Sequence, residues 1–170
     1  MPEGRLTLVL GGARSGKSRH AETLIESLAP PWTYIATAQA HDDEMRRRIA
    51  EHRLRRGGEW ETVEAPAGLS SAIAAVPDWR PLLIDCLTLW LTNVMLAGDD
   101  VEAASRDLAA LLGRPRGPWF VVANEVGLGI VPDNALARRF RDAAGRLNQM
   151  VARNADAVLF MVAGLPMKVK

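Results

Sequence analysis

The sequence predicts an α/β fold with a mostly parallel central sheet and helices on both faces. Short apolar runs, typical of buried strands, alternate along the chain with stretches of helical periodicity. A glycine-rich segment follows the first apolar run and precedes the first helical stretch. Strands joined through helices run parallel, and a parallel sheet needs helices on both faces to bury it.

Length and composition predict one domain spanning residues 1–170. Hydrophobic residues make up 48% of the chain and charged residues 24%, as in ordinary globular proteins. Cys86 is the one cysteine, so no disulfide can form within the chain, and the first apolar run is too short for a signal peptide or a membrane span. We therefore expect a soluble, cytoplasmic protein without stable membrane insertion. A net charge of +1 offers no basis for binding nucleic acid.

The first half of the chain alternates strands and helices in a regular order. Residues 6–10 form an apolar strand that ends in glycines, and residues 17–29 have helical spacing until Pro30-Pro31 stops them. Residues 32–38 predict a second strand. A helix beginning at residue 42 carries its acidic residues before its arginines, which suits the helix dipole. Residues 61–66 predict a short strand or an extended loop, and residues 68–76 a helix.

The second half continues the alternation. Residues 81–87 predict a strand that carries an acidic residue near its end. Residues 87–96 and 101–112 predict two helices around the turn AGDD. A strand over 118–126, a long amphipathic helix over 136–155 and a final strand over 157–164 complete the series. Turn and linker signals nowhere divide the chain into two units.

The segment GGARSGKS matches the phosphate-binding pattern G-x-x-x-x-G-K-[ST], and it lies between a strand and a helix as that pattern requires. Its residues are Gly11, Gly12, Ala13, Arg14, Ser15, Gly16, Lys17 and Ser18. Glycines let backbone N–H groups wrap a phosphate, and the helix N-terminus adds positive potential. Lys17 can reach the outer phosphates. The expected fold is that of a P-loop NTPase, RecA-like.

Carboxylates at strand ends are candidates for holding Mg²⁺ beside this loop. Asp85 follows three apolar residues, and with the Ser18 hydroxyl it can bind the metal; the alternative is that it caps the next helix. Asn124 and Glu125 also fall at a strand end, where ligands bind in open α/β sheets. They can position substrate or metal, or Glu125 can pair with an arginine of the following segment.

His52 has two interpretations. Its spacing from Ile49 and Met45 places the three on one helix face, which favours a structural histidine at the edge of the core. The surrounding arginines favour a second interpretation, since they suit a triphosphate and lower the pKa of a neighbouring imidazole. A neutral imidazole is a nucleophile, whereas imidazolium is not.

Several segments together closely resemble the bifunctional adenosylcobinamide kinase / adenosylcobinamide-phosphate guanylyltransferase family of cobalamin biosynthesis. They are GGARSGKSRHAE, YIATAQAHDDEMRRRIAEHR, LLIDCLTLWLTN and NEVGLGIVPDNALARRFRDAAGRLNQ. The resemblance implies that ATP or GTP phosphorylates the aminopropanol hydroxyl of adenosylcobinamide. GTP then transfers GMP to adenosylcobinamide phosphate and releases pyrophosphate. It also implies a homotrimer.

The resemblance further implies which residues act. His52 would carry the GMP as a guanylylated histidine, with Lys17 as the other catalytic residue. The implied guanine-nucleotide contacts, besides the P-loop residues, are Ala36, Thr37, Ala38, Arg53, Leu54, Arg55, Arg56, Glu64 and Asp85. Three rival functions remain: a P-loop small-molecule kinase without guanylyl transfer, a RecA-like nucleic-acid motor, and a non-catalytic nucleotide sensor. A near-neutral chain without a basic, aromatic face argues against the motor.

Overall fold

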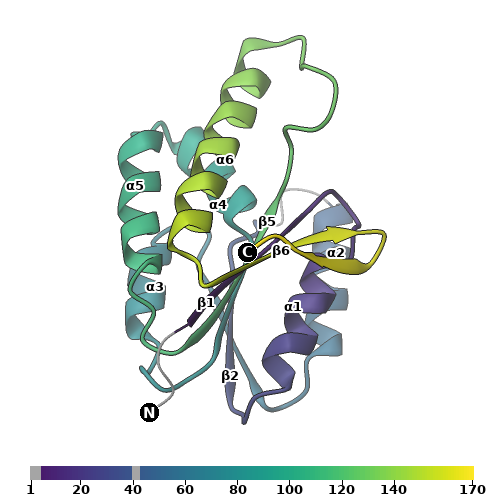
Figure 1. Cartoon of the computed structure of the whole chain (residues 1–170), viewed down its shortest axis with the longest axis vertical. Coiled ribbons are helices and arrows are strands. Elements are labelled where there is room, and N and C mark those ends of the chain that lie inside the picture. The colour runs from purple at the N-terminus through teal and green to yellow at the C-terminus, as the bar shows by residue number, and fades with distance from the viewer. Residues whose placement is uncertain (1–4, 40–42) are drawn as a thin grey trace.

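The computed structural model describes residues 5–39 and 43–170, and within them the chain builds one seven-stranded sheet (Figure 1). The strand order is β3-β2-β4-β5-β1-β6-β7, and every neighbouring pair is parallel except β6 with β7. The strands are β1 (Arg5–Gly11), β2 (Trp32–Ala36), β3 (Trp60–Glu64), β4 (Leu82–Asp85), β5 (Pro118–Asn124), β6 (Ala157–Val162) and β7 (Leu165–Lys168). The mostly parallel sheet predicted from the sequence is therefore confirmed.

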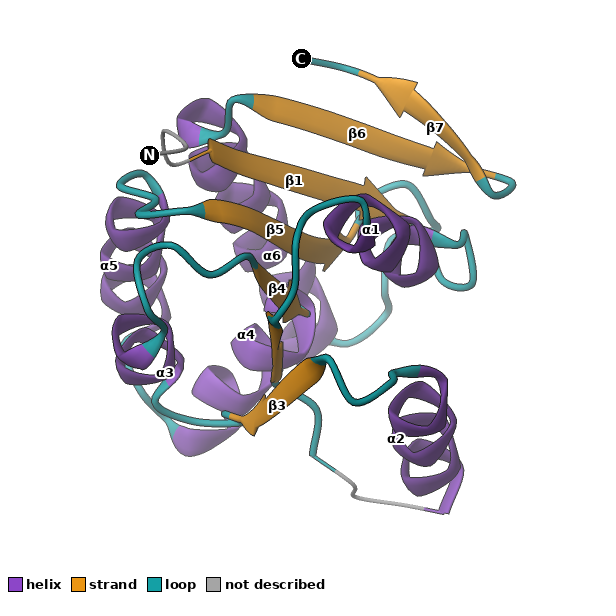
Figure 2. Cartoon of the chain, turned by 90° about the horizontal axis from the view of Figure 1, so that it is seen from below, coloured by secondary structure: helices purple, strands orange, loops and turns teal. Residues whose placement is uncertain are grey.

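Helices cover both faces of the sheet, also as predicted. They are α1 (Lys17–Glu26), α2 (Asp43–Arg55), α3 (Leu69–Ala75), α4 (Leu87–Ala97), α5 (Val101–Leu112) and α6 (Ala135–Asn154). Figures 1 and 2 both place α1 and α2 on one side of the sheet and α3 to α6 on the other. In the described part of the chain, no helix is both long and apolar enough to cross a membrane.

The alternation of side chains along each strand explains the two-sided core. Leu6 and Leu8 of β1 join the larger apolar cluster under α3 to α6, whereas Val9 joins the smaller cluster with Ile25 of α1. Because successive side chains of a strand point to opposite faces, an unbroken apolar run buries both sides at once. Such a run suits β1 to the interior of the sheet, where it lies between β5 and β6.

The end of the chain differs from the prediction. The strand expected over 157–164 ends at Val162, and Ala163 and Gly164 take φ values of 51° and 80° in a tight turn. Leu165–Lys168 then returns as β7, antiparallel to β6, and no strand had been predicted there. Left-handed backbone at both central positions matches the twist of a hairpin, but Ala-Gly is a weak sequence signal for such a turn. Pro166 is tolerated because β7 lies at the sheet edge.

Candidate active site

The phosphate-binding loop connects β1 to α1 in the predicted way. Gly16 has φ 90°, a conformation that favours glycine, and α1 begins at the next residue, Lys17. A Cβ on Gly11 would lie 2.5 Å from the Oγ of Ser15 and 3.1 Å from Met161, so the loop closes tightly over the end of β1. A larger residue at position 11 would require both Ser15 and Met161 to shift.

The β6–β7 turn packs against this loop, and the sequence did not predict this contact. Gly164 N donates a 3.0 Å hydrogen bond to the carbonyl of Ser15. A Cβ on Gly16 would lie 3.3 Å from the Cα of Gly164, so the two backbones are nearly in contact. Gly164 therefore belongs to the structure of the phosphate loop, although it comes almost 150 residues later in the chain. Its only signal in the sequence was the glycine that ends an apolar run.

Polar groups inside the loop fit a phosphate ligand. Lys17 is 8% exposed, and its Nζ donates a 2.7 Å hydrogen bond to the carbonyl of Gly12. The buried Oγ of Ser15 has no hydrogen-bond partner among the described residues. Buried hydroxyls are nearly always paired, so this one retains hydrogen-bonding capacity for a ligand. The first turn of α1 adds N–H groups that have no acceptor within the helix at the same place.

Strand register brings the predicted residues of separate segments to one edge of the sheet. Glu64 pairs with Ala36 across β3 and β2, and Ala36 pairs with Asp85 across β2 and β4. Gly11 pairs with Asn124 across β1 and β5. All of these positions end their strands, so they share the edge at which ligands bind in open α/β sheets.

Thr37 joins the ends of two strands. Its Oγ1 donates to the carbonyl of Cys86 at 2.6 Å and accepts from Cys86 N at 2.9 Å, while its own N donates to the carbonyl of Asp85. Asn93 Nδ2 donates to the carbonyls of Thr37 and Pro66, both at 2.9 Å. Thr37 is fully buried, so in this structure it positions Ala36, Ala38 and Asp85 rather than facing a ligand with its side chain.

Asp85 is half-buried and is held by Tyr34, whose hydroxyl donates a 3.0 Å hydrogen bond to Oδ2. Burial, and then the charge of Asp85, raise the pKa of Tyr34 well above its ordinary value. Tyr34 therefore remains a neutral donor at physiological pH. Burial, reinforced by Asp85, also raises the pKa of the Cys86 thiol to about 12, against the opposing effect of backbone N–H groups at the start of α4.

A cavity of about 760 Å³ gathers several predicted nucleotide contacts between α2 and the ends of β2 and β3. Ala36, Ala38, Arg53, Leu54 and Glu64 all line it, and they come from three separate stretches of the chain. Arg53 and Glu64 form an ion pair across it. Its remaining lining residues are Gln39, Arg46, Ile49, Ala50 and Pro66. The spacing of these stretches in the sequence does not predict that they line one cavity.

The arginines around the end of α2 point to different places. The Arg53 side chain is about half exposed at the cavity, whereas the Arg56 side chain is only 5% exposed and lies over the ring of Tyr34. The side chains of His52 and Arg55 lie outside the described residues, so the structure places only their backbone, within α2.

Glu125 lies beside the phosphate loop. Its N donates to the carbonyl of Gly11 at 3.0 Å, and its Oε1 accepts from Gly127 N at 2.9 Å. Among the described residues, no arginine forms an ion pair with Glu125. The backbone of Glu125 therefore lies at the phosphate loop, and its carboxylate binds the N–H of Gly127 in the segment that follows.

Metal binding at this edge would depend on the nucleotide. The described part of the chain holds no group of three or more His, Cys, Asp or Glu side chains suited to a metal ion. Mg²⁺ commonly uses one or two protein oxygens together with substrate phosphates and water. Ser18 and Asp85 fit that sparse ligand set.

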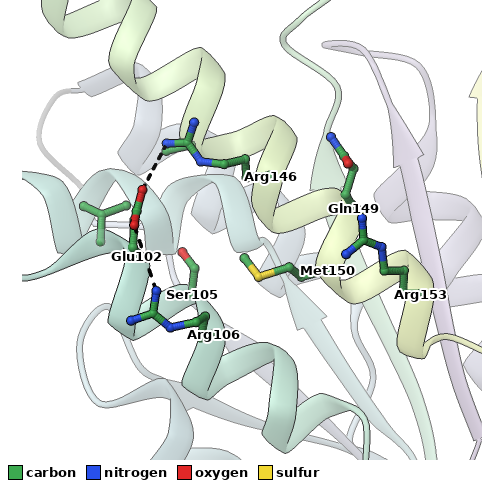
Figure 3. A pocket seen from close by; sticks show the side chains of 9 residues that line it. Glu102, Ser105, Arg106, Arg146, Gln149, Met150 and Arg153 are labelled. Carbon is green, nitrogen blue, oxygen red and sulfur yellow. Dashed lines mark ion pairs between the residues drawn. The ribbon is translucent and has the colours of Figure 1, made fainter.

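A second cavity, of about 370 Å³, lies between α5 and α6 on the other side of the sheet (Figure 3). Arg106 and Arg146 both lie 3.9 Å from the carboxylate of Glu102, and all three side chains are more than half exposed. Such pairs contribute little and are common on solvated surfaces. No residue predicted for nucleotide binding lines this cavity.

Solved structures with similar folds define the class of protein. The chain superposes on an ATPase of the type III secretion system of pathogenic bacteria with a TM-score of 0.61 at 12% identity, covering 98% of this chain and 57% of that one. The P4 protein of bacteriophage phi6, solved with ADP, gives a TM-score of 0.51 at 14% identity over 96% and 54% of the two chains. This chain thus spans little more than half the length of either. With the loop geometry above, the fold is that of a P-loop NTPase.

Sequence comparison defines the family. Residues 7–169 match the family described as cobinamide kinase / cobinamide phosphate guanyltransferase, and the chain belongs to this family. The bifunctional adenosylcobalamin biosynthesis protein CobP of Pseudomonas aeruginosa is 49% identical over 96% of both chains. The bifunctional adenosylcobalamin biosynthesis protein CobU of Salmonella typhimurium is 43% identical over 97% of this chain and 99% of that one. The resemblance seen in the sequence motifs is confirmed.

Proposed function

We propose that this chain phosphorylates the aminopropanol hydroxyl of adenosylcobinamide with ATP or GTP, and then transfers GMP from GTP to adenosylcobinamide phosphate. Family membership supports both activities. The observation that carries the proposal is the cavity that unites Ala36, Ala38, Arg53, Leu54 and Glu64 at the sheet edge where the phosphate loop also ends. One domain, spanning residues 1–170, then serves both reactions.

In the kinase step, the substrate hydroxyl oxygen attacks the γ-phosphorus, the bond to the β–γ bridging oxygen breaks, and the nucleoside diphosphate leaves while the hydroxyl proton passes to solvent. Lys17 and the N–H groups of the loop stabilise charge on the transferred phosphoryl group. Ser18 and Asp85 are the residues that would hold Mg²⁺, which supplies neutralising charge when bound. The Ser15 hydroxyl, which has no hydrogen-bond partner within the described residues, is available to the phosphates.

In the guanylyl step, an imidazole nitrogen of His52 attacks the α-phosphorus of GTP and pyrophosphate leaves. A phosphate oxygen of adenosylcobinamide phosphate then attacks the same phosphorus, the P–N bond breaks, and free His52 is restored. Dividing one displacement into two is the usual gain from a covalent intermediate. The position of His52 supports this role, because it lies three residues after Ile49, which lines the cavity, and such residues are neighbours on a helix surface.

We assign the remaining predicted nucleotide contacts to the same site. The loop residues 11–18 would bind phosphates, and residues 36–38, Arg53, Leu54, Arg55 and Glu64 would bind the guanosine end. Arg56 was also expected to contact the nucleotide, but its side chain is buried against Tyr34, so it would contribute through the position of α2. Asp85 would serve the metal. Thr37 would act through the backbone positions that it fixes.

Three broader proposals accompany this function. We propose a homotrimer, and the exposed apolar side chains of Leu128, Ile130 and Leu165 support subunit contacts. We also propose a cytoplasmic location, where the nucleotide substrates are made. Nucleic acid is not expected as a partner, because the chain carries a net charge of only +1.

Incubation with GTP labelled at the α-phosphate tests the covalent step. We expect label on the protein that is acid-labile and alkali-stable, as a phosphohistidine-type bond is, and that is absent from His52→Ala. His20→Ala is the matched control, since His20 lies on α1 and is assigned no role. If the wild-type protein phosphorylates adenosylcobinamide but takes no label, it is a small-molecule kinase without guanylyl transfer. Label that persists in His52→Ala would assign the nucleophile elsewhere.

A further inference from the structure

Arg56 turns into the protein directly after α2 ends. Its guanidinium carbon lies 3.5 Å from the centroid of the Tyr34 ring on β2, and its side chain is 5% exposed. The other arginines that form ion pairs in the described structure all have more exposed side chains than this one. A cation over an aromatic ring is most favourable when water is excluded, as it is here.

The same guanidinium connects elements that carry the phosphate and metal chemistry. Arg56 Nη1 lies 3.9 Å from Oε1 of Glu22, which is on α1, the helix that begins in the phosphate loop. Tyr34, beneath the guanidinium, donates its hydroxyl hydrogen bond to Asp85. Arg56 therefore contacts α1 directly and reaches the end of β4 through a single side chain.

Burial of Arg56 is costly. Nε and Nη1 have no hydrogen-bond partner among the described residues, and a buried guanidinium with incomplete hydrogen bonding destabilises a fold relative to an apolar side chain of similar size. Stability alone therefore does not explain an arginine here. An arginine is explained if the end of α2 must be held in a defined position, because a planar cation stacked on a ring has a narrow range of orientations.

We propose that Arg56 is a positioning residue for guanylyl transfer: stacked on Tyr34 and facing Glu22, it anchors the end of α2 and so sets the position of His52 relative to the nucleotide. This inference rests on the proposed function of His52. His52 precedes Arg56 by four residues, about one helical turn, so the anchor and the nucleophile move together. Covalent attack tolerates little displacement, because a misplacement of about 1 Å can cost on the order of a hundredfold in rate.

The inference distinguishes the two reactions. The kinase step requires no nucleophile from α2, whereas guanylylation requires His52. A loss of the anchor should therefore slow guanylylation more than phosphorylation. A residue that merely stabilises the fold should affect both reactions alike.

The experiment compares Arg56→Met and Arg56→Lys with the wild-type protein. The rate of labelling by α-labelled GTP is measured in single turnover over a range of GTP concentrations, and the kinase rate is measured separately. We expect Arg56→Met to lower the maximal labelling rate at least about tenfold more than the kinase rate, with a smaller change in the GTP concentration for half-maximal labelling. Arg56→Lys, which keeps a cation over the ring, should recover part of that loss.

Arg80→Met is the matched control. Arg80 is also largely buried, pairs with Glu61 on β3, and has an Nε without a hydrogen-bond partner in the described structure. This variant should lose stability and leave the ratio of the two rates unchanged. If Arg56→Met fails to fold, Arg56→Lys is the variant that tests the inference. We then expect its ratio of labelling rate to kinase rate to change by at least about threefold. An unchanged ratio in the folded Arg56 variants overturns the inference alone, whereas a wild-type protein that takes no label overturns both the inference and the proposed guanylyl step.

Discussion

The Nζ of Lys17 donates a 2.7 Å hydrogen bond to the carbonyl of Gly12, so the lysine of the phosphate loop is held by the loop itself. The bond keeps the ammonium at the loop, where phosphate oxygens can replace the carbonyl as acceptor. The cation is thus in place before nucleotide binds. Such preorganisation matters because a buried donor that is already oriented needs no reorganisation during the reaction.

Lys17→Ala should lower the rates of both phosphorylation and guanylylation by at least about a hundredfold, since one preorganised donor contributes that much in comparable sites. The two rates and nucleotide affinity are measured on the same preparation. Lys168→Ala, on the edge strand β7, is the control for removal of a lysine. Full activity of Lys17→Ala in either reaction would contradict the role of the loop in that reaction.

Asp85→Asn should raise the Mg²⁺ concentration needed for half-maximal kinase activity by at least about tenfold, because the amide removes the negative charge assigned to the metal. Titration of the kinase rate with Mg²⁺ at saturating ATP measures this shift. Asp156→Asn makes the same change at the opposite end of the sheet, where Oδ2 of Asp156 accepts from Leu6 N. That control should leave the Mg²⁺ dependence unaltered, and an identical dependence in both variants would remove Asp85 from the metal site.

Glu64→Gln should weaken GTP binding with little effect on stability. The carboxylate pairs with Arg53 at the cavity, but both side chains are more than half exposed, so the pair contributes little to folding. We expect a several-fold rise in the GTP concentration for half-maximal labelling and an unchanged melting temperature. A lower melting temperature with unchanged GTP dependence would assign Glu64 to the fold.

Thr37→Val should lower the free energy of unfolding by about 2–4 kcal/mol, because both the N–H and the carbonyl of Cys86 lose their buried partner. Urea denaturation of the two proteins gives the difference. Thr37→Ser keeps the hydroxyl and should recover most of the loss. A Thr37→Val protein within about 0.5 kcal/mol of the wild type would show that water can replace the hydroxyl.

Stability should fall with rising pH through the Cys86 thiol. Its pKa is about 12 in the folded protein, against an ordinary value of 9.0, so between these values the unfolded chain binds fewer protons than the folded one. The stabilisation is complete below pH 9, and above it this thiol removes about 1.4 kcal/mol per pH unit from the free energy of unfolding. The difference between the wild type and Cys86→Ala, measured at pH 7 and about pH 10, should therefore shrink by about that amount. A pH-independent difference would mean that the thiol ionises readily in the folded protein.

Local patterns predicted the strands, the helices and the phosphate loop well. The helix predicted over 101–112 agrees with α5 (Val101–Leu112), whose N-cap Asp100 accepts from the N–H groups of Glu102 and Ala103. Capping residues, periodicity and glycine spacing act through neighbours in sequence, so the sequence records them directly. The β6–β7 hairpin was missed because its Ala-Gly turn carries little of the usual turn signal.

The sequence by itself determined the class of fold, the phosphate loop and the family. Each of these depends on residues close together in the chain or on several sequence motifs taken together. Only the tertiary structure decided that Gly164 braces Ser15, that Glu64, Ala36 and Asp85 form one row, and that Arg56 faces Tyr34 while Arg53 faces the cavity. Arg53 and Arg56 lie close together in an arginine-rich segment, and no local sequence preference predicts that their side chains point to different places. What separates them is packing against β2 and α1, which depends on contacts between residues distant in the chain.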